Sequence, residues 1–524
     1  MVFCKDKDKV IKRLKDITSY YSFGRVLGYF RFQESGNPQQ NFERKFLPDS
    51  ERLISTEFAF LAGMWLCNVE ISKKWPIEDD YAYLRETNQL MADLHLCYKP
   101  VENMPFNEQL KEIAFYEGDP GYAWQFLNYA EQKYDDELFR TYLLDGHNFN
   151  IKVLKSTYEK IISVIENQIN KRKCIKRHKY ISPINAFTIS LKKVRDVFNK
   201  SEQDIIHSLS IKLGEVRTSI TDISDRNIFT QYPIIELPNN QGFFIIEPLT
   251  LSIAMNETPF YWIMNSTRFS DSKIGDIRGS IAEKIVYNII RKKFSDGQIF
   301  KNIIIKKTKS SNVITDIDIL VIFQNICFIF QVKSKRLTEL SKCGDWDTIN
   351  RDFDAAVINA YNQGCKCVTC LKESQKYYSL SKVNIGINDK TTFFNICVTL
   401  DQYPTISSMC FFKSFEIGNS DIPLLAMSIY DLELIFDFLS VDEIIEYLEF
   451  RSKCFRNKIY GVSEVYYLGE YIHSLIFGSI YVHQDGYKIS KEAAMFVDYI
   501  VDLSREKKCD IKSIKDIRLL LKMY

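Results

Sequence analysis

Apolar residues recur every three or four positions through the first 230 residues. The pattern is clearest in ERLISTEFAFLAGMWLCNVEI, YAYLRETNQLMADLHL and NIKVLKSTYEKIISVIENQINKR. This spacing places the apolar side chains along one face of a helix. We therefore expect residues 1–230 to form a mainly helical N-terminal domain.

The pattern changes after this region. PIIEL and GFFIIEP are short β-rich runs on either side of PNNQG, a turn sequence. Two such runs around a turn predict a β-hairpin. We assign residues 231–270 to a hairpin and connector.

Residues 271–420 alternate between helical spacing of apolar residues and short β-rich runs. They predict a helix at about 278–294, a strand near 300–306, a helix near 350–363, and strands in FFNICVTLD and MCFFKSF. Alternation of this kind indicates a mixed α/β domain. Residues 421–524 return to helix, and two capping boxes, Ser428 with Asp431 and Ser440 with Glu443, open successive helices. The fold class is multidomain, α plus α/β, with helical regions at both ends.

The longest apolar stretch, TDIDILVIFQNICFIFQVKSK, is polar at both ends and at Gln324–Asn325 in its middle. If these two residues form a hairpin turn, Phe323 pairs with Ile326 and Asp318 falls opposite Gln331. Asp316 then falls opposite Lys333. Because side chains alternate between faces, all four would share one face, and the other face would be apolar from Ile317 to Val332.

Carboxylate, amide oxygen and lysine at one corner of a sheet suit a hard cation such as Mg²⁺ and a phosphate substrate. The alternative is a purely structural one, in which the open end of the hairpin is polar because it meets solvent. A third acid, Glu283, borders the buried stripe of the helix RGSIAEKIVYNIIRKKF and could point toward Asp318. A glutamate at a solvated helix edge is the alternative there.

The order of helix with Glu283, strand, Asp318 and then QVK resembles the PD-(D/E)XK nuclease superfamily. Gln331 stands where the usual acid would be, which is similar to the variant in Mrr-type restriction endonucleases. The resemblance covers about residues 275–415 and implies a restriction-endonuclease-like core. It implies catalytic roles for Glu283, Asp318, Gln331 and Lys333, with the first three as metal ligands. Asp316 and Gln363, on the following helix, are auxiliary candidates.

The same resemblance implies a Mg²⁺-dependent deoxyribonuclease, in which Mn²⁺ can substitute, acting on double-stranded DNA in a bacterial defence or restriction system. One alternative is a degenerate nuclease fold that binds nucleic acid or a protein. Another is a domain that only mediates assembly. The helical regions are candidates for contacts with a protein partner or a second copy.

Composition limits the possible partners and the cellular location. The net charge is +2, so any nucleic-acid contact must come from a local patch. The charged N-terminus and the lack of a long uncharged apolar run predict a cytoplasmic protein without a membrane span. The basic segment NKRKCIKRHKY is a weak nucleic-acid signal, with a solvated helix end as the alternative.

The 13 cysteines are expected to be reduced thiols. Zinc binding by Cys343 and the thiols of GCKCVTC is the minor alternative, because paired CxxC knuckles are absent. The six histidines have no metal-ligand spacing.

From the sequence alone, Gln331→Glu should keep activity and need less metal, because it adds a charged ligand.

Overall fold

The computed structural model describes residues 6–34, 53–73, 75, 80–98, 115–116, 121–173, 183–295, 298–307, 312–338, 341, 346–373, 378–379, 387–403, 406–417, 422–478 and 488–522. The chain divides into two compact units, Met1–Asp271 and Ser272–Tyr524. The predicted nuclease-like domain and the C-terminal helical region thus lie in one unit. Most of the basic segment, from residue 174 to 180, lies outside the described residues.

The first unit is mainly helical, as the apolar spacing predicts. The three quoted segments form α4, α5 and α9. The helices of this unit are α1 (Lys7–Thr18), α2 (Phe23–Glu34), α4 (Ser55–Asn68), α5 (Asp80–Tyr98), α7 (Ala123–Lys133), α8 (Glu137–His147), α9 (Leu154–Lys173), α10 (Pro183–Ala186), α11 (Leu191–Val197), α12 (Lys200–Ser208) and α13 (Pro248–Met264).

The first unit also contains a small sheet. Its strands are β1 (Thr188–Ile189), β2 (Ser210–Lys212), β3 (Ile234–Leu237) and β4 (Gly242–Phe244), in the order β1-β4-β3-β2. The predicted hairpin is β3 with β4, and its central turn residues Asn239 and Asn240 both have positive φ. Asparagine tolerates this conformation better than most residues, which explains the turn.

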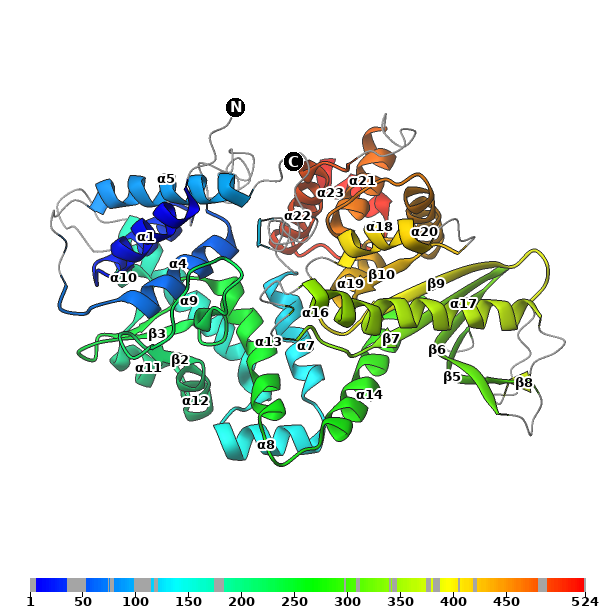
Figure 1. Cartoon of the computed structure of the whole chain (residues 1–524), viewed down its shortest axis with the longest axis horizontal. Helices are drawn as coiled ribbons and strands as arrows, with labels where there is room; N and C mark the ends of the chain where they lie inside the picture. Colours follow the sequence, from blue (N-terminus) through cyan, green and yellow to red (C-terminus); the bar gives the residue numbers. More distant parts are fainter. Residues whose placement is uncertain are drawn as a thin grey trace. The chain divides into compact units, whose positions relative to one another are not determined.

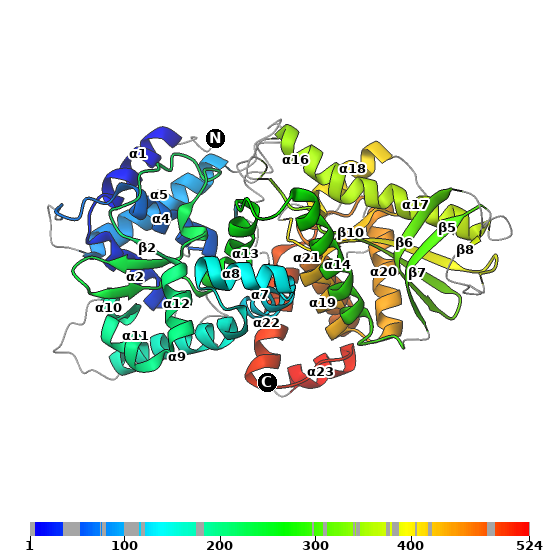
Figure 2. The same cartoon turned by 90° about the horizontal axis from the view of Figure 1, so that it is seen from below.

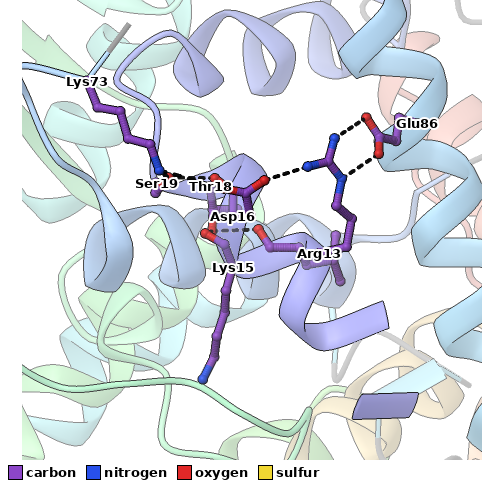
Figure 3. Close-up of polar contacts among 8 residues, drawn as sticks. Arg13, Lys15, Asp16, Thr18, Ser19, Lys73 and Glu86 are labelled. Atoms are coloured by element: carbon purple, nitrogen blue, oxygen red, sulfur yellow. Dashed lines mark hydrogen bonds and ion pairs between the residues drawn. The ribbon is translucent and has the colours of Figure 1, made fainter. Parts of the chain in front are cut away.

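Ion pairs tie α1 to α5 at the surface of the first unit (Figure 3). Arg13 forms a two-pronged contact with Glu86, at 2.6 Å and 3.0 Å, and also meets Asp16 of its own helix. Lys73 donates to the Ser19 hydroxyl at the end of α1. Exposed pairs of this kind contribute little stability, so buried apolar residues of α1 and α5 hold the helices together.

The second unit is built on a six-stranded mixed sheet (Figure 1). The strands are β5 (Ile299–Lys306), β6 (Val313–Phe323), β7 (Ile326–Lys333), β8 (Tyr378–Ser379), β9 (Thr392–Thr399) and β10 (Leu425–Ser428), in the order β10-β9-β7-β6-β5-β8. β5, β6 and β7 are antiparallel neighbours, whereas β9 runs parallel to β7 and β10 parallel to β9.

Parallel neighbours need a crossover, and the helical segment between β7 and β9 supplies it. It consists of α16 (Trp346–Phe353), a π-helical turn (Asp354–Ile358) and α17 (Asn359–Lys372). α17 packs on β6, β7 and β9, and Figure 2 shows it alongside these strands. The predicted strands at 300–306 and in FFNICVTLD are confirmed as β5 and β9.

The predicted strand in MCFFKSF is wrong. These residues lie in a helix, α18 (Ile406–Ile417). Short apolar runs do not distinguish a strand from a buried helix. The first five residues of α18, 406–410, are all buried, so this part of the helix is enclosed on every side and shows no exposed face.

The tail is helical, as expected. It comprises α19 (Ile429–Phe438), α20 (Val441–Arg456), α21 (Glu464–Phe477), α22 (Lys491–Glu506) and α23 (Ile514–Lys522). Both predicted capping boxes are present at the starts of α19 and α20. None of the helices in the described part of the chain is long and apolar enough to cross a bilayer.

A buried ion pair joins α20 to α21. Arg451 Nε and Nη2 donate to the two carboxylate oxygens of Glu464 at 2.8 Å and 3.0 Å, and Tyr447 also donates to this carboxylate. The Arg451 guanidinium lies 3.5 Å from the centroid of the Tyr467 ring. The charges are therefore fully paired inside an apolar setting, which is the condition for tolerating them there.

Removing one partner should be costly. We expect Arg451→Ala to lower the free energy of unfolding by roughly 3–5 kcal/mol, because Glu464 would remain buried without its cation. Urea unfolding followed by circular dichroism measures this. Lys453→Ala, at an exposed position of the same helix, is the control and should change the value by less than about 0.5 kcal/mol. Equal effects of the two substitutions would contradict the role of the pair.

Candidate active site at the open end of the β6–β7 hairpin

The predicted hairpin register is confirmed over the five residue pairs nearest the turn, and the pairs Asp318–Gln331 and Asp316–Lys333 lie beyond the observed pairing. Phe323 pairs with Ile326, and the antiparallel pairing continues to Ile319 and Phe330. Gln324, the first turn residue, has a φ of 53°, which is the left-handed conformation that tight hairpin turns use. The backbone pairing stops one pair short of Asp318 and Gln331, and from there side chains bridge the two strands.

The alternation of side chains along β6 changes between Ile317 and Leu320. Strict alternation would place these two residues on opposite faces. Both instead belong to one apolar cluster that includes α17, with the members Ile303, Ile305, Ile317, Leu320, Cys327, Ile329, Cys367, Val368, Cys370 and Leu371. The prediction that Ile317 lies on the opposite face is therefore wrong, and the four polar residues are not related by simple alternation.

The change occurs beside an irregularity in β5. Asn302 has a φ of 52°, and the register places it opposite Asp318, between the pairs Lys301–Ile319 and Ile303–Ile317. A left-handed residue interrupts the pleat of a strand. Asp318 consequently lies where the strand leaves its regular course, and its Oδ2 accepts a hydrogen bond from the Val332 N–H at 2.7 Å.

Three side chains converge on the backbone carbonyl oxygen of Asp316. Gln331 Nε2 donates to it at 2.9 Å, Gln363 Nε2 at 3.2 Å, and the Cys367 thiol at 3.3 Å. Only the NH₂ end of an amide can donate. The contact therefore fixes the orientation of the Gln331 amide and turns its Oε1 away from the Asp316 carbonyl.

Gln363 also connects two side chains of the predicted site. Its Oε1 accepts from Lys333 Nζ at 3.0 Å, and its Nε2 donates to Asp316 Oδ1 at 2.9 Å. One amide on α17 thus holds the ammonium group of β7 and the carboxylate of β6. The structure brings this auxiliary candidate into contact with both strands.

The pKa values of Asp318 and Glu283 are both raised, and Asp318 contributes to the shift of Glu283. Burial raises the pKa of the Asp318 carboxyl, although the Val332 hydrogen bond and the charge of Lys333 oppose the shift. The pKa of Glu283, on α14 (Asp271–Ile290), is raised by burial and next by the carboxylate of Asp318. Lys301 and Lys333 act in the opposite direction. Glu283 on α14 is therefore close enough to Asp318 and Lys333 for their charges to shift its pKa.

The donors present fit a hydrated Mg²⁺ better than a fully protein-ligated metal. No three histidine, cysteine or acidic side chains of the described residues are arranged to hold an ion. Gln331 is fully buried, however, and its Oε1 has no hydrogen-bond partner within the described part of the chain. An amide oxygen without a partner and a carboxylate are kinds of oxygen ligand that Mg²⁺ takes, and this ion keeps several waters.

Sequence reasoning missed the placement of two residues at this site. Thr399, which pairs with Lys333 across β7 and β9, has a buried hydroxyl without a partner in the described structure. Burial raises the pKa of the Cys367 thiol to about 12, so it acts here as a neutral donor. Thr399 stands in no pattern that a single sequence marks as functional, and the cysteine pattern around Cys367 suggested zinc and not a hydrogen-bond donor.

The zinc alternative gains no support. Cys365, Cys367 and Cys370 are free thiols on α17, and they form no metal-binding group with described residues. Cys343, like His178 and His483, lies outside the described residues.

A family model described as the nuclease-related domain, NERD, matches residues 278–393. The match begins in α14, covers β5, β6 and β7, and ends in β9. It therefore includes Glu283, Asp318, Gln331 and Lys333. No curated protein and no solved structure matches the chain. The match supports a nuclease-related domain but gives no information on the Mrr-type variant.

The raised pKa of Glu283 predicts a pH-dependent effect on stability. The ionised carboxylate is less favourable in the folded state than in the unfolded state. The free energy of unfolding therefore falls as pH rises through the folded pKa of Glu283. We expect Glu283→Gln to raise the melting temperature of the metal-free protein at pH 7. The gain should shrink at pH 4, where the parental carboxyl is largely protonated. A melting-temperature difference that is the same at both pH values would contradict this electrostatic account.

Proposed function

We propose that this protein is a metal-dependent nuclease that hydrolyses phosphodiester bonds, with DNA as the substrate. The observation that carries the proposal is that the Asp318 carboxylate accepts from the β7 backbone between Gln331 and Lys333, where the β6–β7 pairing ends, within the region matched by the nuclease-related family. The role in a bacterial defence or restriction system stays an expectation from the resemblance.

The residues present suggest separate roles. Asp318 and Gln331 would hold Mg²⁺ or Mn²⁺, with Glu283 contributing charge from α14. The ion would polarise the phosphate and lower the pKa of a bound water. Lys333, held by Gln363, is placed to stabilise negative charge that develops on the phosphate oxygens. Asp316 positions Gln331 and Gln363 through its backbone oxygen.

The alternative is a nuclease fold that binds nucleic acid without cutting it. Against it, the lysine, the aspartate and the amide are all present and hydrogen-bonded at one end of the hairpin. Gel shift without cleavage, under conditions that supply Mg²⁺, would favour this alternative.

The proposal predicts that two substitutions remove cleavage for different reasons. Asp318→Ala should reduce plasmid cleavage below detection, because the charged metal ligand is lost. Lys333→Ala should slow it by roughly 100- to 1,000-fold, which is typical when a group that stabilises transition-state charge is removed. Metal affinity, measured by calorimetry, should fall for Asp318→Ala and stay near the parental value for Lys333→Ala.

Asp389→Ala and Lys453→Ala are matched controls at exposed positions and should cut at the parental rate. Circular dichroism should establish that each variant folds. Parental activity in folded Asp318→Ala would place the catalytic site elsewhere.

The structure changes the expectation for Gln331→Glu. A carboxylate at this buried position would place an acceptor against the Asp316 carbonyl oxygen, where the amide now donates. Losing a buried hydrogen bond costs about 1–3 kcal/mol. We now expect cleavage at saturating Mg²⁺ to fall by roughly tenfold, which corresponds to about 1.4 kcal/mol in the barrier.

The measurement is the cleavage rate as a function of Mg²⁺ concentration for both proteins. A lower metal midpoint with reduced maximal rate fits a charged ligand in a distorted site. A parental rate at every concentration would show that the Asp316 contact does not position Gln331 for catalysis.

A further inference from the structure

Two cations flank one aromatic ring beside the candidate active site. Tyr287 lies on α14, one helical turn after Glu283, and Arg291 follows after another turn. The Arg291 guanidinium lies 5.9 Å from the centroid of the Tyr287 ring, and Lys301 Nζ of β5 lies 4.2 Å from it. The ring therefore holds both side chains by cation–π contact.

Neither cation forms an ion pair within the described part of the chain, although the charge of Lys301 acts on the Glu283 carboxyl, and both residues are exposed. By contrast, the neighbouring Lys292 pairs with Glu433 and Asp437. Unpaired cations close to carboxylates are free to bind an external anion. Lys301 is also close to the site along the sheet, because it pairs with Ile319, the residue that follows Asp318 in β6.

We propose that Lys301 and Arg291, organised by Tyr287, form a strip that binds the phosphates of the nucleic-acid strand next to the bond being cut. This proposal rests on the proposed function of the same site and adds how the substrate is held. Because both side chains would contact the phosphates of the nucleic acid and not its bases, the strip contributes affinity but no sequence specificity. It also supplies the local positive patch that a chain of net charge +2 needs.

The dimensions fit a short length of strand. The eight residues from Glu283 to Arg291 rise by about 12 Å at 1.5 Å per residue. Successive phosphates of one DNA strand rise by about 3.4 Å along the duplex axis. The strip therefore spans roughly three or four phosphates from the acidic end of the site.

Salt dependence of binding tests the strip without requiring cleavage. Fluorescence anisotropy would follow a labelled 20-mer duplex and the corresponding single strand in EDTA, over a range of NaCl concentrations. Lys301→Ala and Arg291→Ala should each reduce the slope of log affinity against log salt by about 0.9 for duplex or 0.7 for single strand. The double variant should lose about twice as much.

Lys453→Ala removes an equal charge from α20 and should leave the slope unchanged. Tyr287→Phe keeps the ring and should bind like the parent, whereas Tyr287→Leu should bind more weakly. Parental slopes in Lys301→Ala and Arg291→Ala would overturn the proposal, as would no binding by the unaltered protein. If the lysine only protects the exposed part of the β5 edge, Lys301→Ala should promote self-association and leave the slope unchanged, which also overturns it.

Cleavage by the unaltered protein is measured separately with Mg²⁺. Altered slopes without any cleavage would support the strip and contradict the proposed nuclease. Cleavage by the unaltered protein, together with parental salt slopes in the variants, would support the nuclease and contradict the strip.

Discussion

The backbone carbonyl oxygen of Asp316 accepts hydrogen bonds from Gln331, Gln363 and Cys367, and the arrangement of the candidate site depends on it. These donors come from β7 and α17, so one backbone atom of β6 joins three elements. Because a carbonyl oxygen can only accept, it selects the donor end of each amide. The free carbonyl oxygen of Gln331 is a consequence of that selection.

This constraint also explains why glutamine suits the position. An acid at residue 331 would add charge to a site where burial already raises the pKa values of Asp318 and Glu283. The amide adds no charge, and its hydrogen bond to the Asp316 carbonyl oxygen holds β6 against β7 where their backbone pairing ends. The Lys333 ammonium donates to Gln363, and its charge opposes the rise in the pKa values of the Asp318 and Glu283 carboxyls.

Much of the second unit could be predicted from its sequence. The apolar stretch with Gln324–Asn325 at its centre determines the hairpin register, because a slip of one residue would expose apolar side chains. The buried stripe of α14 likewise determined which edge of the helix carries Glu283. The change of alternation at Asp318 could not be predicted, because it lies opposite a left-handed residue, Asn302, that the sequence of another strand does not reveal. MCFFKSF was assigned to a strand because a short apolar run carries no decisive period, and its surroundings determine that it is helical.

The most direct test is the position of a metal ion in a crystal of the unaltered protein grown with Mn²⁺. The account predicts an anomalous peak with an Asp318 carboxylate oxygen and Gln331 Oε1 at about 2.0–2.2 Å, the distance range of such oxygen ligands. The Gln331 Nε2 contact with the Asp316 carbonyl oxygen should persist. A fully loaded ion elsewhere, or a Gln331 amide turned with Oε1 toward Asp316, would contradict the account.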